Sequence, residues 1–251
     1  MKNGDGAPPV VVKNLRKSYG EQTVLDGIDL TVARGETVSV LGRSGTGKSV
    51  FLKLLIGLQA PDSGSISIDG REITDLPLAQ LNEIRKRIGF LFQQAALYDS
   101  LTVEENVAFP LVRHTALSPK QRSQRVHELL ASVEMDHDAG KMPSEISGGM
   151  QKRVGIARAL ALDPAILLFD EPTSRLDPIT AEEIGNLILE FQKRRNITSI
   201  VVTHDVRGAR SFSNRFVVIH EGRIVGQGTL EELKETREGF VADFLRSSRS
   251  I

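Results

Sequence analysis

The chain has 251 residues, with 32 lysines and arginines balanced by 32 aspartates and glutamates. This length suits one large α/β domain or a domain with a subdomain, and the even charge argues against a nucleic-acid partner. Because there is no cysteine, disulfides, iron–sulfur clusters and thiol catalysis are excluded. The longest apolar runs, such as residues 165–169, are far too short to span a membrane. Any role at a membrane would therefore require a partner protein.

Residues 1–9 are polar, contain glycine and proline, and lack the apolar core of a signal peptide. We expect them to form a short disordered lead. The folded domain is expected over residues 10–245, and residues 246–251 are expected to form a C-terminal tail.

The first hundred residues indicate mainly strands. Apolar and alternating runs predict strands at residues 10–15, 28–32, 37–41, 65–68, 71–73 and 88–92. Asp69 and Gly70 are a two-residue hairpin signal, and residues 61–64 predict a turn. Apolar residues on one face predict a helix over residues 48–58.

A helical pattern follows. Thr102 with Glu105, and Ser118 with Gln121, have the spacing of capping boxes, and Pro119 suits a first helical position. We therefore expect a helical subdomain over about residues 95–162, inserted between two β-rich parts.

Strands and helices alternate over the rest of the chain. Strands are predicted at residues 165–169, 199–202, 216–219 and 224–226, and helices at 179–194 and 206–211. Thr229 with Glu232 has capping-box spacing and predicts a last helix. This alternation implies a largely parallel sheet, in which ligands bind beyond the carboxyl ends of the strands. Gly42, the pair 170–171 and the pair 203–204 each follow a strand, so they should gather at one edge.

Residues 42–49 fit the phosphate-binding P-loop pattern, with a strand before them and an amphipathic helix after them. The glycines let backbone N–H groups turn toward phosphate oxygens, and the helix adds its positive end. Lys48 would place a cation on the β- and γ-phosphates, and Ser49 would offer its hydroxyl to Mg²⁺. The expected nucleotide ligands here are Gly42, Ser44, Gly45, Thr46, Gly47, Lys48, Ser49 and Val50.

Three further polar residues follow predicted strands. Asp170 suits Mg²⁺ binding, directly or through water, and Glu171 could accept a proton from the attacking water. Both could also be acidic residues that merely begin a turn. The place of His204 favours a contact with the γ-phosphate.

Ser147, Gly148 and Gly149 open a helix. A serine and two glycines at a helix N-terminus can bind an anion, and they can equally be a plain N-cap with flexible glycines. The residues alone leave both readings open.

Together these motifs resemble those of the nucleotide-binding subunits of ABC transporters, from Val10 to about Leu245. The resemblance implies a P-loop NTPase (RecA-like) α/β core with an antiparallel β subdomain and a helical signature subdomain. It identifies residues 147–151 as the signature and 174–177 as the D-loop. It implies that Tyr19 stacks on adenine, and that Gln93 is the Q-loop glutamine, catalytic and among the Mg²⁺ ligands.

The same resemblance implies an activity and partners. Two copies would sandwich two ATP molecules, each between the P-loop of one copy and the signature of the other. ATP hydrolysis would drive an integral membrane permease, at the cytoplasmic face of the inner membrane. A non-transport switch of the ABC type and a non-hydrolysing ATP-dependent clamp are alternatives, although Glu171 argues against the clamp.

A closer resemblance is to the ATPases of Mla/MCE-type lipid transporters. Four short stretches carry it, at residues 47–50, 92–111, 177–180 and 240–245, and Met150 agrees with this branch. The resemblance implies phospholipid or related lipid transport and a lipid-binding MCE-type partner. The alternative is the ATPase of another importer, for instance of amino acids.

Two expectations concern contacts with other chains. In the D-loop, Arg175 stands where the family usually has glycine or alanine, which puts packing at the dimer seam in doubt. The resemblance also places a permease helix in a groove beside the insertion after Gln93. We expect one or two of Leu97, Tyr98 and Phe109 to be exposed in the isolated subunit.

Overall fold

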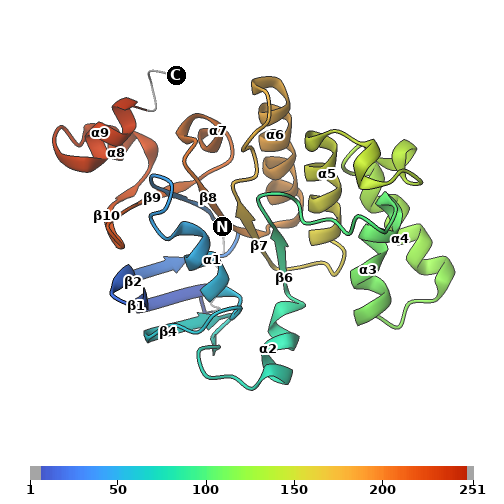
Figure 1. The fold of residues 1–251 in the computed structure, drawn as a ribbon, viewed down its shortest axis with the longest axis horizontal. Helices are drawn as coiled ribbons and strands as arrows, with labels where there is room; N and C mark the ends of the chain where they lie inside the picture. The colour runs from blue at the N-terminus through green and yellow to red at the C-terminus, as the bar shows by residue number, and fades with distance from the viewer. Residues whose placement is uncertain (1–6, 248–251) are drawn as a thin grey trace, which may run out of the picture.

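The computed structural model describes residues 7–247, so positions 1–6 of the expected lead and 248–251 of the expected tail lie outside the described residues. Figure 1 shows two sheets with helices around them and a group of helices at one end. Within the described residues, no helix combines the length and the apolar character that crossing a membrane requires.

The smaller sheet is antiparallel, with strand order β2-β1-β4-β5. Its strands are β1 (Val10–Tyr19), β2 (Gln22–Val32), β4 (Ser63–Ile68) and β5 (Arg71–Glu72). The strand β4 begins at Ser63, inside the segment 61–64 that was expected to be only a turn. Gly64 has φ 89°, and a Cβ there would lie 2.4 Å from the carbonyl oxygen of Asn14, so this position in the strand requires glycine.

The larger sheet has strand order β10-β9-β3-β8-β7-β6 and is parallel except for the pair β9 and β10. Its strands are β3 (Thr37–Leu41), β6 (Ile88–Leu91), β7 (Ile166–Asp170), β8 (Thr198–Thr203), β9 (Arg215–His220) and β10 (Arg223–Gly228). The prediction of a parallel core with an antiparallel β subdomain is confirmed.

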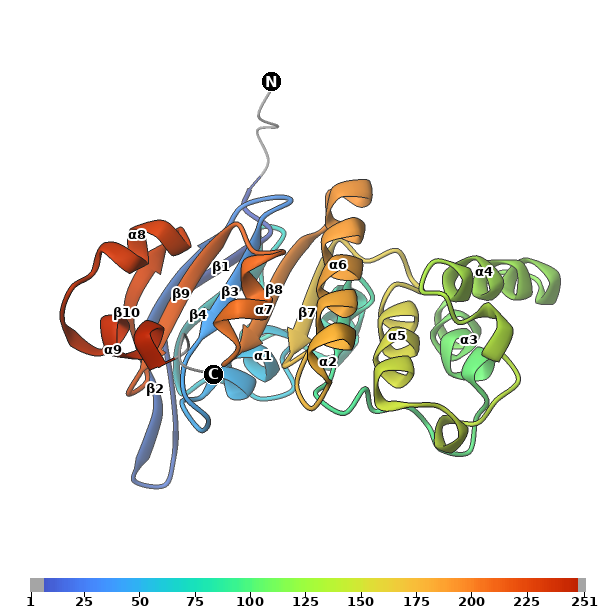
Figure 2. The same ribbon diagram turned by 90° about the horizontal axis from the view of Figure 1, so that it is seen from above.

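The helices are α1 (Lys48–Leu55), α2 (Leu78–Arg85), α3 (Val103–His114), α4 (Pro119–Ala131), α5 (Gly148–Ala159), α6 (Pro178–Arg195), α7 (Val206–Arg210), α8 (Leu230–Glu235) and α9 (Gly239–Ser247). Two short 3₁₀ helices, η1 (Asp136–Asp138) and η2 (Pro143–Glu145), precede α5. The expected capping boxes at Thr102, Ser118 and Thr229 are present. Figure 2 shows α3, α4 and α5 grouped at the end of the molecule opposite α8 and α9.

Some predicted boundaries were wrong. The helix α1 ends at Leu55 rather than at residue 58, and α2 was not predicted because it buries only Leu81 and Ile84. The helix begun after Thr229 is not the last one, since α9 follows it and continues two residues into the expected tail. The expected lead is too long, because the carbonyl of Pro9 accepts a hydrogen bond of 2.8 Å from the backbone N of Asp69.

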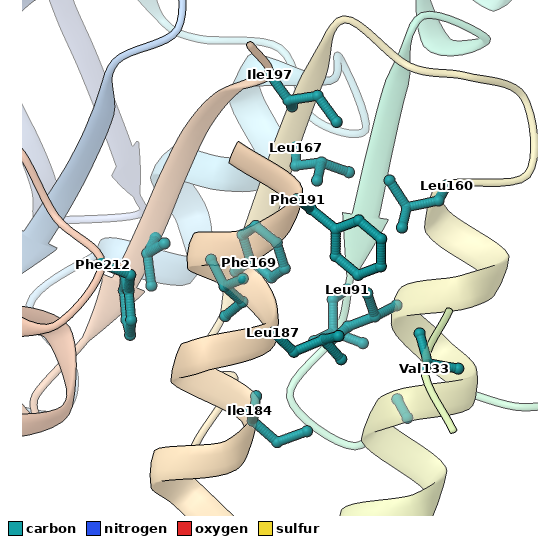
Figure 3. Close-up of a cluster of buried hydrophobic side chains, with 14 of the residues drawn as sticks. Leu91, Val133, Leu160, Leu167, Phe169, Ile184, Leu187, Phe191, Ile197 and Phe212 are labelled. Atoms are coloured by element: carbon teal, nitrogen blue, oxygen red, sulfur yellow. The ribbon is translucent and has the colours of Figure 1, made fainter. Parts of the chain in front are cut away.

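The core has two parts, one on each face of the larger sheet. On one face, Ile166 and Leu168 of β7 belong to the cluster that includes Phe51 of α1. On the other face, Leu167 and Phe169 belong to the cluster shown in Figure 3, with Leu187 and Phe191 of α6. Because alternate side chains of β7 are buried on opposite faces, the strand is apolar throughout until Asp170. The acidic residues thus begin where the buried strand meets its carboxyl edge.

Candidate active site

The loop 42–47 connects β3 to α1, and its backbone requires glycine. Gly45 and Gly47 have φ of 82° and 90°, in the left-handed region that favours glycine. A Cβ on Gly42 would lie 2.7 Å from the carbonyl oxygen of Ile219, so the loop passes against β9. These positions explain the P-loop pattern as a requirement of the fold at the edge where the sequence predicts a nucleotide site.

Lys48 begins α1 and is buried. Its Nζ donates hydrogen bonds to the carbonyl oxygens of Gly42, at 2.8 Å, and Arg43, at 2.9 Å. Burial lowers the pKa of this ammonium, and the nearby carboxylates of Glu171 and Asp170 oppose that shift. The cation therefore lies inside the loop that is expected to hold phosphates.

Ser49 and Asp170 meet although they are far apart in the sequence. The Ser49 hydroxyl donates to Oδ1 of Asp170 at 2.9 Å. Burial raises the pKa of the Asp170 carboxyl, while the hydrogen bond from Ser49 acts in the opposite direction. Among the described residues there is no group of three or more His, Cys, Asp and Glu side chains placed to hold a metal ion. A serine hydroxyl and one carboxylate nevertheless suit Mg²⁺, which keeps waters and takes its other ligands from substrate phosphates.

Glu171 follows Asp170 and is buried, with a left-handed φ of 49°. The hydroxyl of Thr203 donates to its Oε2 at 2.9 Å, and Nδ1 of His204 lies 2.9 Å from its Oε1. The His204 side chain itself is 56% exposed. The structure therefore joins two residues that the sequence predicted separately, and adds Thr203, whose role had no signal beyond its place at a strand end.

Gln93 lies just beyond β6 and is exposed. Its backbone carbonyl accepts a hydrogen bond from the ammonium of Lys152 in α5. The same ammonium donates to the backbone carbonyl of Glu171 at 3.1 Å. Lys152 was not predicted from the sequence. The sequence shows only a lysine between the apolar residues of α5, and a lysine in a helix normally lies on the solvated face.

Tyr19 ends β1 and is 45% exposed. Its hydroxyl donates to Oε1 of Gln59 at 2.5 Å, and the Lys17 ammonium lies 5.4 Å from its ring centroid. These contacts hold the ring at the surface, where an adenine base could stack on it. Stacking itself stays a prediction.

Within a single chain, the predicted signature residues lie away from the P-loop. Ser147 caps α5 by accepting from the backbone N of Met150 at 3.3 Å. Ser147 and Gly148 are exposed, and a Cβ on Gly149 would lie 2.5 Å from Cγ2 of Thr180. No hydrogen bond links residues 147–149 to the P-loop within the described part of the chain, and Figure 1 shows α5 on the far side of β7 and β6 from α1. The N-cap is thus observed, and the anion site stays a prediction.

Arg175 lies in the loop between β7 and α6. It is exposed and has φ 62°, a left-handed conformation that glycine adopts without cost and that a residue with a side chain rarely adopts. The departure from the family pattern noted in the sequence therefore falls at a position where the backbone itself favours glycine.

Comparison with known proteins agrees with this arrangement. The profile of the family described as "ABC transporter" matches residues 25–174. The "Probable ribonucleotide transport ATP-binding protein mkl" of Mycobacterium leprae is 42% identical over 98% of this chain and 72% of its own length. The methionine import ATP-binding protein MetN of Rhizobium johnstonii is 44% identical, over 87% of this chain and 60% of its own length.

Two solved structures share the fold. The ATP-binding cassette MJ0796, in a dimeric post-hydrolysis state bound to ADP and Pi, superposes with a TM-score of 0.82 at 38% identity, covering 92% of this chain and all of that one. The cbiO1 protein of Clostridium perfringens, part of the cbiONQ transporter complex, gives a TM-score of 0.84 at 32% identity, covering 97% of each chain.

The chain therefore belongs to the ABC transporter family. It is an ATPase of that family, in which ATP hydrolysis is coupled to transport. The relatives named above concern ribonucleotide and methionine transport, so the expected closeness to lipid-transport ATPases is not reflected in their names.

Proposed function

We propose that two copies of this chain close on ATP, hydrolyse it and thereby drive a membrane permease. The observation that carries the proposal is that the two halves of the expected ATP site lie at separate places on one chain. The P-loop, Asp170 and Glu171 meet at one edge of the larger sheet, while the exposed Ser147 and Gly148 open a helix elsewhere. A second copy would complete each site, and the relative MJ0796 is described as a dimer.

The side chains of one copy divide the chemistry among them. Lys48 would move from the carbonyls of Gly42 and Arg43 to the β- and γ-phosphates when ATP enters, since phosphate oxygens are stronger acceptors for an ammonium. Ser49 and Asp170 would hold Mg²⁺, which supplies charge neutralisation on the phosphates when bound.

Glu171 would act as the general base toward water. Its two oxygens are oriented by Thr203 and His204, so the carboxylate is held in one direction before the substrate arrives. His204 is exposed enough to reach a phosphate from the same edge. We propose that it contacts the γ-phosphate, and that Gln93 approaches the metal from the adjacent strand end.

The permease would dock on a groove between the larger sheet and the helical subdomain. The groove is lined by aromatic and cationic side chains, among them Phe90, Phe92, Tyr98, Phe109 and Arg158. The rings of Tyr98 and Phe109 lie 4.7 Å apart, and Tyr98 is 46% exposed. Such apolar anchors suit a helix of a partner. We propose that the subunit lies at the cytoplasmic face of the membrane, as its membership of the ABC transporter family implies.

Two substrate classes follow from different observations. The names of the relatives favour import of a small polar solute, such as a ribonucleotide or an amino acid. The four sequence stretches and Met150 favour a lipid, with an MCE-type lipid-binding partner. We take solute import as the first candidate, since it rests on alignments over most of the chain.

Affinity purification of the subunit from its native membranes distinguishes the two. Co-purification of a permease with a solute-binding protein supports import, and co-purification with a lipid-binding protein and bound phospholipid supports lipid transport. Recovery of ribosomal proteins without a permease would contradict both.

A further inference from the structure

Lys152 is a buried lysine in the middle of α5, only 4% exposed. Its ammonium touches two segments that both belong to the expected site, the carbonyl of Gln93 and the carbonyl of Glu171. Desolvation lowers its pKa to about 8, so the charge is kept in place at a cost. A buried charge with two backbone partners from different strand ends calls for an explanation beyond packing.

The backbone carbonyl oxygen of Glu171 accepts three hydrogen bonds. Besides the Lys152 ammonium, it accepts from the backbone N of Ser174 at 3.2 Å and from the Ser174 hydroxyl at 3.0 Å. The φ of 49° at Glu171 is a conformation that a residue with a side chain rarely adopts, and surrounding contacts must maintain it. The peptide group of Glu171 sets the direction in which its carboxylate leaves the chain. Lys152 is therefore placed to influence the orientation of that carboxylate.

The loop after Gln93 is also held by α5. Ala95 and Ala96 have φ of 57° and 49°, and the Arg158 guanidinium donates to their carbonyls at 2.6 and 2.8 Å. Two cations of one helix thus fix the same loop. Of the two, Lys152 also bonds to Glu171, and no bond from Arg158 to Glu171 occurs in the described part of the chain.

We propose that Lys152 is a positioning residue for hydrolysis, tying the Gln93 loop and the Glu171 peptide group to the helix that opens with the signature. The proposal rests on the proposed role of Glu171 as base. It gives a physical link within one chain: a shift of α5, caused by a partner at Ser147 or at the permease groove, would move the Gln93 loop and the catalytic carboxylate together. Because the link is a bond to the backbone, it acts through Glu171 rather than on the substrate.

The test is a pair of double-mutant cycles on the full chain, with single-turnover ATP hydrolysis as the main readout. Lys152→Met removes the ammonium but keeps the length of the side chain. Arg158→Met is the matched control, since it loosens the same loop without reaching Glu171. Each is made alone and together with Glu171→Gln. ATP affinity and melting temperature are measured for every variant.

We expect Lys152→Met to slow hydrolysis by about 10- to 100-fold, the scale of a small misplacement of a catalytic group. ATP affinity should change by less than about twofold, because no phosphate ligand is lost. In the Glu171→Gln background the same change should slow hydrolysis much less, by no more than Arg158→Met does, since the carboxylate that it positions is absent and only the hold on the Gln93 loop is still lost. Arg158→Met should slow both backgrounds by the same factor. Lys152→Arg should recover part of the rate.

Equal factors for Lys152→Met in both backgrounds, or an unchanged rate in the wild-type background, would overturn the proposal. If Lys152→Met does not fold, Lys152→Gln takes its place, because an amide can still donate one hydrogen bond. Failure of the proposed base is recognised separately, since Glu171→Gln alone would then hydrolyse ATP at the wild-type rate.

Discussion

The Nδ1 atom of His204 lies 2.9 Å from Oε1 of Glu171, which links the residues that follow the adjacent strands β8 and β7. The second oxygen of the same carboxylate accepts from Thr203 at 2.9 Å. A carboxylate with both oxygens engaged has little freedom to rotate, so its direction is set by the sheet. The two expected catalytic residues are therefore a unit, and a change in one should be felt by the other.

We predict that Glu171→Gln slows hydrolysis by roughly 100-fold or more, the scale of a lost general base. The glutamine amide cannot take a proton from water, but its oxygen can still accept from Thr203, so the fold and ATP binding should be kept. ATP should then hold two copies together long enough for light scattering to detect the dimer. Normal turnover of this variant would move the role of base to another residue, with His204 the first to be tested.

We predict that Lys48→Ala abolishes ATPase activity. Lys48 is the cation enclosed by the loop 42–47, and stabilising phosphate charge accounts for most of the catalysis of phosphoryl transfer. The loss should already appear in binding, so ATP should no longer raise the melting temperature as it does for the wild type. Lys13, exposed in β1, provides a control, and Lys13→Ala should keep the ATP-dependent shift. Near-wild-type turnover of Lys48→Ala in the assembled transporter would contradict the P-loop assignment.

Much of this site could be predicted from the sequence, because its residues follow buried strands. Once 37–41, 165–169 and 199–202 were recognised as apolar strands, the positions of Gly42, Asp170 and His204 at one edge followed from the rules of parallel sheets. Local signals of the same kind predicted the three capping boxes. Turns and apolar periodicity depend only on residues that are a few positions apart in the sequence, so they can be predicted from it.

The contacts that the sequence did not predict depend on distant segments. Lys152 reaches Gln93 and Glu171 because α5 packs against β6, the neighbour of β7 in the sheet, and no local pattern marks a buried lysine. The hydrogen bond from the Tyr19 hydroxyl to Gln59 likewise joins residues from two distant parts of the chain. The helix α2 was not predicted because only two of its residues, Leu81 and Ile84, are buried.

We predict that Arg175→Gly has two separable effects: it strengthens ATP-driven dimerisation, and it stabilises the free subunit. Two copies of Arg175 should approach one another at the dimer seam, where unpaired like charges repel. The φ of 62° in the single subunit disfavours arginine and suits glycine, so the substitution relieves backbone strain there and should raise the melting temperature of the free subunit. Arg175→Gln is the matched control, because it removes the charge and keeps the strain.

The two contributions differ in their response to salt. The gain shared by Arg175→Gly and Arg175→Gln should shrink in high salt, because it is electrostatic. The additional effect of Arg175→Gly, a higher melting temperature of the free subunit than that of Arg175→Gln, should persist in high salt. Dimer dissociation constants from sedimentation at two ionic strengths check this. An unchanged constant for both variants at low salt would show that Arg175 is simply solvated.

The expectation that one or two of Leu97, Tyr98 and Phe109 are exposed is confirmed at Tyr98, which is 46% exposed. Leu97 and Phe109 are only half-buried, and Leu97 packs against the core. Phe109 supports the Tyr98 ring at 4.7 Å and carries the Arg113 guanidinium 5.2 Å from its own ring. Tyr98 is thus the residue of the three whose replacement should affect the groove and not the core.

We predict that Tyr98→Asp releases the subunit from its permease while ATP binding and the melting temperature of the free subunit stay close to those of the wild type. A carboxylate at this point would be desolvated by a docked helix without a partner, which opposes binding. Val112→Asp is the control, since Val112 is 56% exposed in the same helical subdomain but lines a different groove, between α3 and α4. Co-purification with the membrane partner should be lost for Tyr98→Asp and kept for Val112→Asp. If Tyr98→Asp is stable and still co-purifies, the permease docks elsewhere, and the path from the Gln93 loop to the permease loses its endpoint.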